Sequence, residues 1–146
     1  MQILRKIAEF RPKYSDMITI YTSYIRSILE QSCQVWHSSL TQENAEDLER
    51  VQRSALRIIL DEKFISYEHS LEVLNLETLA ERRKKLCLNF AQKCLKNEKT
   101  FDMFPKNSPK KKTRKQEIFK VNFASTERLK RSSIPYMQRL LNEETS

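Results

Sequence analysis

The sequence contains no glycine at all among its 146 residues. Phosphate-cradling loops, the dinucleotide-binding turn and the strained turn that carries the nucleophile of many hydrolases all need glycine. In each of them the backbone takes positive φ angles or passes close to a ligand, which a side chain would prevent. The sequence therefore excludes these three kinds of site.

Long apolar runs and a secretory leader are also missing. No apolar run approaches the roughly 20 residues that span a bilayer. Residues 1–7 introduce charge too early for the apolar core of a signal peptide, and there is no small-residue cleavage site. Three cysteines cannot all pair within one chain, which favours a reducing compartment. We therefore expect an intracellular protein, in the nucleus, the cytoplasm or both, with no membrane contact.

Positive charge is concentrated in the C-terminal part of a chain whose formal net charge is +8. Residues 1–104 hold 16 basic and 15 acidic side chains, whereas residues 105–139 hold 11 basic and 2 acidic ones. The densest tract consists of Lys110, Lys111, Lys112, Arg114 and Lys115. Such a tract is usually solvated or bound to an anionic partner, most often nucleic acid. The same composition also fits a nuclear-import signal.

Apolar residues recur at the three- and four-residue spacing of amphipathic helices along most of the first 100 residues. After a short helix at residues 2–10, this spacing predicts four main helices. They begin at caps near Ser15, Thr41, Ser66 and Thr78, and they end near residues 36, 60, 75 and 97. Thr78 and Glu81 have the spacing of a capping box. Asn75 stands where a residue in the left-handed conformation often closes a helix.

The pattern changes after residue 100. Residues 105–116 contain prolines and cations but no apolar side chain to bury beyond the prolines, which predicts a solvent-exposed linker. Pro135 suits the first turn of a short final helix that reaches about Leu141. We therefore predict an all-α fold, a small helical bundle of about four main helices plus a short C-terminal helix, with a basic flexible linker. Its predicted parts are a helical domain at 1–104, the linker at 105–116 and a C-terminal segment at 117–146.

A second group of cations lies on the predicted second helix. Arg50, Arg53 and Arg57 follow helical spacing opposite the apolar stripe, so they can lie along a phosphate backbone. A solvated outer face balanced by Glu46 and Glu49 explains the same pattern equally well. The run at residues 82–85 must wrap around its helix, with two members near the core boundary, where we expect them to reach out to the surface.

No pattern in the sequence completes a catalytic or metal site. Cys33 and His37 are four residues apart and would share a helix face, but a structural zinc site needs four ligands. The aspartates never form the adjacent pair that gathers two magnesium ions for nucleotidyl transfer. A hydrolase that uses Cys33 or Cys87 with a histidine has no local signature, although such sites assemble in space. We predict no catalytic residue, no metal site and no cofactor.

Six segments of the chain, taken in order, are similar in sequence to a known protein family. They read IYTSYIRSILE (20–30), VWHSSLT (35–41), LERVQRSALRII (48–59), SYE (66–68), LNLETLAERR (74–83) and TERLKRSSIPY (126–136). In this order they resemble the region just downstream of the polymerase palm in jockey-like non-LTR retrotransposon reverse transcriptases. The resemblance spans nearly the whole chain. Two residues depart from it. Asn75 stands where the family commonly has glycine, and Gln34 stands where it often has proline.

The resemblance implies that the first three helices form a thumb and that the remainder is the C-terminal segment of the element. The family's catalytic carboxylates belong to the palm, upstream of this chain, so the resemblance implies no RNA-directed DNA polymerase activity here. The thumb of the family tracks template and primer, and together with the charge of the basic tract and the three arginines this predicts weak, sequence-independent RNA or DNA binding. Since thumb faces meet the missing palm in the parent enzyme, we also expect self-association. The alternative is a helical protein-interaction module with no nucleic-acid role.

Overall fold

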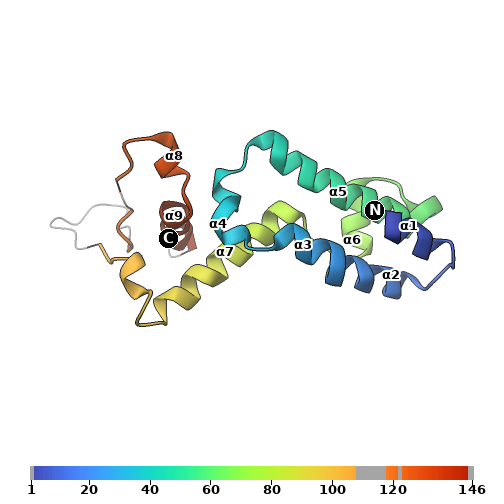
Figure 1. Cartoon of the computed structure of the whole chain (residues 1–146), viewed down its shortest axis with the longest axis horizontal. Coiled ribbons are helices and arrows are strands. Elements are labelled where there is room, and N and C mark those ends of the chain that lie inside the picture. Colours follow the sequence, from blue (N-terminus) through green and yellow to red (C-terminus); the bar gives the residue numbers. More distant parts are fainter. Residues whose placement is uncertain (1, 108–117, 122, 145–146) are drawn as a thin grey trace. The chain divides into compact units, whose positions relative to one another are not determined.

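The structure, a computed structural model, describes residues 2–107, 118–121 and 123–144. Within these ranges the regular structure is helical, apart from one antiparallel bridge between Lys106 and Phe119 (Figure 1). The predicted all-α fold is confirmed. The chain divides into two compact units: unit 1 comprises residues 1–31 and 41–82, and unit 2 comprises residues 32–40 and 83–146. None of the helices in the described ranges is both long and apolar enough to span a membrane.

The first long helix departs from the prediction. After α1 (Gln2–Ala8), the chain forms α2 (Tyr14–Ile20), a π-helical turn η1 (Tyr21–Arg26) and α3 (Ser27–Glu30), which are continuous with one another. Ser32 then takes a φ of 52°, and α4 (Cys33–Trp36) begins as a separate helix. A single helix to residue 36 was therefore wrong. The apolar spacing continues across the break, and no glycine or proline marks it.

The other predicted helix starts are confirmed. α5 (Gln42–Leu60) and α6 (Tyr67–Val73) begin where the side chains of Thr41 and Ser66 accept backbone N–H bonds. α7 (Leu79–Leu95) begins with the predicted capping box, because Glu81 N–H donates to Thr78 Oγ1 at 3.2 Å and Thr78 N–H donates to Glu81 Oε2 at 3.3 Å. The final helix is α9 (Ser133–Glu144). Short elements complete the described chain: η2 (His37–Ser39), η3 (Asp61–Lys63), η4 (Phe101–Met103) and α8 (Glu127–Lys130).

The core of unit 1 forms around the inner face of α5. Ala55, Leu56 and Ile59 recur at helical spacing and are buried there. They pack in one cluster with side chains from α1, α2, η1 and α6, namely Leu4, Met17, Tyr21 and Tyr67. Burying each large apolar side chain of this kind contributes roughly 1.5–3 kcal/mol. This packing holds α5 with its opposite face directed to solvent.

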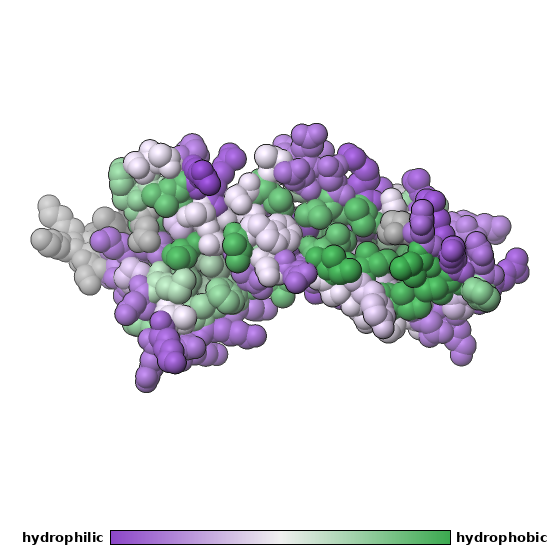
Figure 2. Space-filling model, in the orientation of Figure 1, coloured by the Kyte–Doolittle hydropathy of each residue, from purple (hydrophilic) through white to green (hydrophobic). Residues whose placement is uncertain are grey.

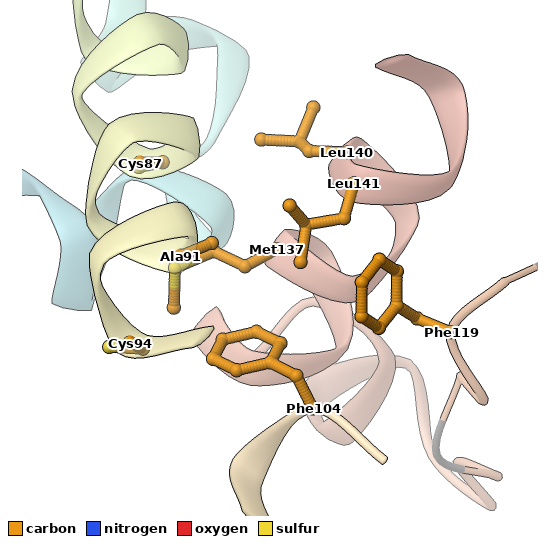
Figure 3. Close-up of a cluster of buried hydrophobic side chains, with 8 residues drawn as sticks. All are labelled: Cys87, Ala91, Cys94, Phe104, Phe119, Met137, Leu140 and Leu141. Atoms are coloured by element: carbon orange, nitrogen blue, oxygen red, sulfur yellow. The ribbon is translucent and has the colours of Figure 1, made fainter. Parts of the chain in front are cut away.

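The core of unit 2 forms between α7 and α9 (Figure 3). Cys87, Ala91 and Cys94 line the inner face of α7, whereas Met137, Leu140 and Leu141 come from α9. Phe104 and Phe119 complete the cluster. The Asn142 side chain clamps the backbone of Phe119, accepting its N–H and donating to its C=O at 2.9 Å each.

The two units do not coincide with the predicted divisions at residues 104 and 116. A change in composition suggested a boundary near residue 105, but α9 and Phe119 are apolar enough to share a core with α7. Residues 105–107 also differ from an open linker, because Asn107 N–H donates to Ile118 C=O at 2.7 Å and Lys120 N–H donates to Pro105 C=O at 2.9 Å. The chain instead passes between the units after residues 31, 40 and 82, and the last of these points falls inside α7.

Residues with side chains occupy backbone conformations that glycine usually takes. The positive-φ positions are Arg11, Ser32, Asp61 and Asn75. Asn75 confirms the predicted helix end. Asp61 is the most unusual of these residues, since its φ of 46° is combined with a ψ of −117°. A Cβ atom is poorly tolerated in this region, and such a conformation costs about 1–3 kcal/mol in a non-glycine residue.

We expect Asp61→Gly to stabilise unit 1 by about 1 kcal/mol, because glycine relieves the Cβ clash at the end of α5. The greater conformational entropy that glycine gives the unfolded chain offsets part of this stabilisation. The measurement is the urea midpoint at an unchanged dependence on denaturant. Asp61→Ala is the matched control, since it removes the same carboxylate but keeps Cβ. Equal stabilisation by alanine would show that the charge of Asp61, and not its backbone, is responsible.

Candidate nucleic-acid interface

The structure places the three predicted arginines of α5 together on its exposed face. Arg50, Arg53 and Arg57 are all exposed, whereas Gln52 and Leu56, which lie between them in sequence, are buried. The inner face packs in the unit 1 core, so the arginine face is the one left for solvent or for a partner. We call these three side chains the α5 stripe.

The carboxylate that pairs with the α5 stripe is Asp47, whereas the sequence suggested Glu46 and Glu49. Arg50 pairs with Asp47 at 2.7 Å, an exposed contact that contributes at most about 1 kcal/mol. Glu46 instead accepts a hydrogen bond from Gln42. Glu49 is directed inward, where its carboxylate accepts the backbone N–H groups of Ala80 at 2.7 Å and Leu79 at 3.3 Å. One of the two carboxylates expected to balance the stripe is thus used at the start of α7.

Aromatic rings support the other two arginines of the stripe. The guanidinium carbon of Arg53 lies 5.1 Å from the centre of the Tyr67 ring, and that of Arg57 lies 4.9 Å from the centre of the Phe64 ring. A cation–π contact uses the flat face of a guanidinium group. The N–H groups at its edge remain suited to donate to phosphate oxygens. The two rings therefore orient cations without neutralising them.

Tyr67 is itself held by a buried hydrogen-bond network. Its hydroxyl donates to Glu49 at 2.5 Å and accepts from Gln52 Nε2 at 2.9 Å. Gln52 also donates to Glu77 C=O at 2.9 Å and accepts from the Tyr21 hydroxyl at 2.6 Å. Burial raises the pKa of Tyr67 well above its usual value, and its hydrogen bond to Glu49 raises it further. The phenol remains a neutral donor at physiological pH, so the ring beneath Arg53 stays in place.

The sequence did not predict this network. Its members come from η1, α5, α6 and the start of α7, and directly bonded partners are up to 31 residues apart in the sequence. The available signal was a single polar residue, Gln52, inside the apolar stripe of α5. A lone glutamine among apolar neighbours does not reveal its partners.

Three further cations lie near the C-terminal end of the α5 stripe. Arg57 lines an open hollow of about 800 Å³ together with Arg5, Arg11 and Lys13. Glu9, Asp61 and Glu62 line it as well and offset most of this positive charge. The sequence could not indicate the grouping, because Arg5, Arg11 and Lys13 belong to α1 and the turn after it. Contacts between α1 and α5 bring them to the stripe.

The basic tract of Lys110, Lys111, Lys112, Arg114 and Lys115 lies outside the described residues. Its immediate surroundings are described, and the hydrogen bond between Asn107 and Ile118 anchors both flanks in unit 2. Further exposed cations in unit 2 are Lys106, Lys120, Arg128 and Arg131. The strong positive balance of residues 105–139 is therefore accompanied by exposed cations within the described part of this region.

The basic run at residues 82–85 behaves differently from the α5 stripe. Arg82 donates to both carboxylate oxygens of Glu30, at 2.5 and 3.1 Å, and this hydrogen bonding raises its pKa. Arg83 is 0% exposed, with its guanidinium carbon 5.9 Å from the centre of the Trp36 ring. Two members of this run, which the sequence did not single out, were expected near the core boundary. The expected reach to the surface is wrong for Arg83, which packs inside unit 2.

The three cysteines considered for metal binding or catalysis are buried, and His37 and His69 are partly buried. Across residues 2–107, 118–121 and 123–144, no group of three or more histidine, cysteine or acidic side chains is placed to hold a metal ion. Burial and the nearby Arg83 lower the pKa of His37, whose ring centre lies 5.6 Å from that of Tyr136 in a T-shaped arrangement. Burial is also the main cause that raises the pKa of Cys87 to about 12. A neutral buried thiol is a poor nucleophile.

Comparisons of the chain with protein-family models, with curated proteins and with solved structures find no match in any of the three.

Proposed function

We propose that this chain binds RNA or DNA through phosphate contacts, without preference for base sequence. The observation that carries the proposal is the charge of residues 105–139, which hold 11 basic and 2 acidic side chains. Each phosphate that these cations neutralise releases counterions, which gives affinity without reading bases. We further propose that the chain corresponds to the thumb and C-terminal region of a jockey-like non-LTR reverse transcriptase, and that it acts in the nucleus or cytoplasm without polymerase activity.

The α5 stripe supplies a second, weaker surface in this proposal. Arg53 and Arg57 are oriented by aromatic rings and keep donors for phosphate, whereas Arg50 shares its charge with Asp47. The acidic side chains around the nearby hollow limit the local positive potential. We therefore assign most of the affinity to the basic tract and a smaller share to the stripe.

The alternative function is a helical protein-interaction module. The observation that favours it is the apolar surface of unit 1, where Tyr24 and Ile28 are each 70% exposed on η1 and α3. Figure 2 shows apolar residues gathered on the visible face over these helices. Exposed apolar patches often mark a protein partner, which in the parent polymerase would be the palm and in this chain alone would be a second copy. Sedimentation at increasing concentration distinguishes a self-associating chain from a monomer.

The nucleic-acid proposal is tested by replacing Lys110, Lys111, Lys112, Arg114 and Lys115 with alanine. We expect affinity for unrelated sequences to fall by roughly 10- to 100-fold at low salt, since several phosphate contacts are lost. The plot of log affinity against log salt should flatten by up to about 0.9 per lost contact on duplex DNA, or about 0.7 on single strands. Fluorescence anisotropy with labelled duplex and single-stranded oligonucleotides of scrambled sequence provides both quantities.

The control changes Arg50, Arg53 and Arg57 to alanine, which removes three positive charges from a different surface, against five in the tract variant. We expect this variant to lose less affinity than the tract variant and to keep most of the salt dependence. If the tract variant retains both quantities and the α5 variant loses both, α5 is the binding surface. If the unaltered chain binds no oligonucleotide even at low salt, the nucleic-acid function is rejected and the interaction module takes its place.

A further inference from the structure

Two buried cysteines from distant parts of the sequence meet in unit 2. Cys33 is the first residue of α4, and Cys87 lies on the inner face of α7. The thiol of Cys87 donates to the backbone C=O of Cys33, with 3.9 Å between sulfur and oxygen. The side chain of Cys33 also interacts with the Cys87 thiol and helps to raise its pKa. The two thiols are therefore neighbours within one compact unit.

The third cysteine is placed differently. Cys94 is also buried on α7, but it lies seven residues after Cys87, which corresponds to roughly 10 Å along a helix. It belongs to the same core cluster as Phe104 and Phe119, close to the end of α7 (Figure 3). A disulfide requires Cβ atoms about 3.5–4.5 Å apart. Cys94 therefore serves as an internal control for any chemistry of the other two thiols.

We propose that Cys33 and Cys87 form an oxidisable dithiol that closes to an intramolecular disulfide, with hydrogen peroxide as the oxidant. One thiol is first oxidised by peroxide to a sulfenic acid, with release of one water molecule. The second sulfur attacks this sulfenic sulfur, an S–S bond forms, the S–O bond breaks, and the hydroxyl group leaves as water with the thiol proton. Two electrons pass from the two thiols to one peroxide molecule, which becomes two water molecules.

Burial determines how fast this reaction proceeds. Cys33 is 0% exposed and Cys87 is 1% exposed, so a small oxidant is required and local opening of the unit must admit it. Burial also raises the pKa of Cys87 to about 12, so little of its reactive thiolate is present at neutral pH. We expect slow oxidation that accelerates with rising pH, and a disulfide that is resistant to reductants once it is buried again.

The disulfide would join two stretches of chain that unit 2 holds together by packing. Residues 32–40 are separated from residues 83–146 by the whole second stretch of unit 1. A link from Cys33 to Cys87 closes a loop of about 55 residues, and in the chain-entropy account this raises the unfolding midpoint by roughly 10 °C. The α5 stripe belongs to unit 1, so this inference is independent of the proposed nucleic-acid function.

The test is to expose the full-length chain to hydrogen peroxide under native conditions and then block, digest and map it. Trypsin places the three cysteines in different peptides, namely residues 27–50, 86–93 and 94–96. We expect a cross-link between the first two peptides, a monomer lighter by two hydrogen atoms at these positions, and a free thiol in the third. Trp36 fluorescence, from the only tryptophan of the chain, should show the higher midpoint, and a strong reductant should reverse it.

Variants separate the pair from unspecific oxidation. Cys94→Ala should form the same cross-link as the unaltered chain, whereas Cys33→Ala and Cys87→Ala should form none. Peptide mapping of the unaltered chain remains decisive even where an alanine variant fails to fold. The proposal is overturned by sulfinic acid at Cys33 or Cys87 without a cross-link, by a cross-link through Cys94 or between two chains, or by full recovery of all three thiols.

Discussion

Replacing Gln52 with alanine is expected to destabilise unit 1 by roughly 3–4 kcal/mol, a large share of the stability of a small domain. Gln52 is 1% exposed and joins Tyr21, Tyr67 and Glu77 through three hydrogen bonds. Alanine leaves the Tyr21 hydroxyl and the Glu77 C=O buried without this partner, and each such loss costs about 1–3 kcal/mol. Urea unfolding followed by far-UV circular dichroism measures the change.

The control for this prediction lies on the same helix. Gln42 also donates its side-chain amide, but to Glu46 at the exposed start of α5. Gln42→Ala should change stability by less than about 0.5 kcal/mol, because water replaces the lost partner. Similar midpoints for the two variants would contradict the buried network. Gln52→Ala should also free the Tyr67 ring, so a reduced contribution of Arg53 to oligonucleotide binding is expected where the variant remains folded.

Replacing Phe104 with alanine is expected to cost unit 2 about 3–5 kcal/mol. The ring is 0% exposed and packs in the cluster between α7 and α9 (Figure 3). Its removal leaves a cavity between helices that are held in place by their own backbone hydrogen bonds, so the surrounding side chains can close the gap only in part. Trp36 lies in unit 2, and its fluorescence during urea unfolding therefore reports the loss in the affected unit.

Phe123→Ala is the matched control for Phe104→Ala. This phenylalanine is 91% exposed, so the same truncation removes an equal number of atoms from a side chain with little buried contact. Its effect should stay within about 0.5 kcal/mol. A loss of several kcal/mol at Phe123, or little loss at Phe104, would show that the core of unit 2 is formed by other residues.

The parts of the fold that were predictable are those governed by neighbouring residues. Thr41, Ser66 and Thr78 cap helices through hydrogen bonds to backbone groups three positions away, so their spacing in the sequence contains the whole interaction. The exposed position of Arg50, Arg53 and Arg57 follows in the same way from helical spacing. The all-α class then follows from helices with short connections.

The remaining features depend on contacts between distant residues. The break at Ser32 lies within a continuous apolar pattern, and α4 then packs with α9 at the far end of the chain. Arg83 carries the same charge as its neighbours in the run at 82–85, but its burial is determined by the α7 face on which it falls and by Trp36. The inward direction of Glu49 likewise depends on the start of α7, about 30 positions later. The local periodicity of the sequence does not predict these long-range contacts.

Because the two units are interleaved in the sequence, unit 1 can fold before unit 2 as the chain leaves the ribosome. Residues 32–40 emerge early, but the rest of their unit begins at residue 83. Unit 1 has all its parts once residue 82 has emerged, so it can fold while Cys33 and Trp36 still await α7 and α9. Such long-range pairing slows folding, and it leaves Cys33 and Trp36 open to wrong partners during synthesis. A nascent chain halted shortly after residue 82 has emerged should therefore bind chaperones through residues 32–40. Emergence of the complete α9 should release the chaperones.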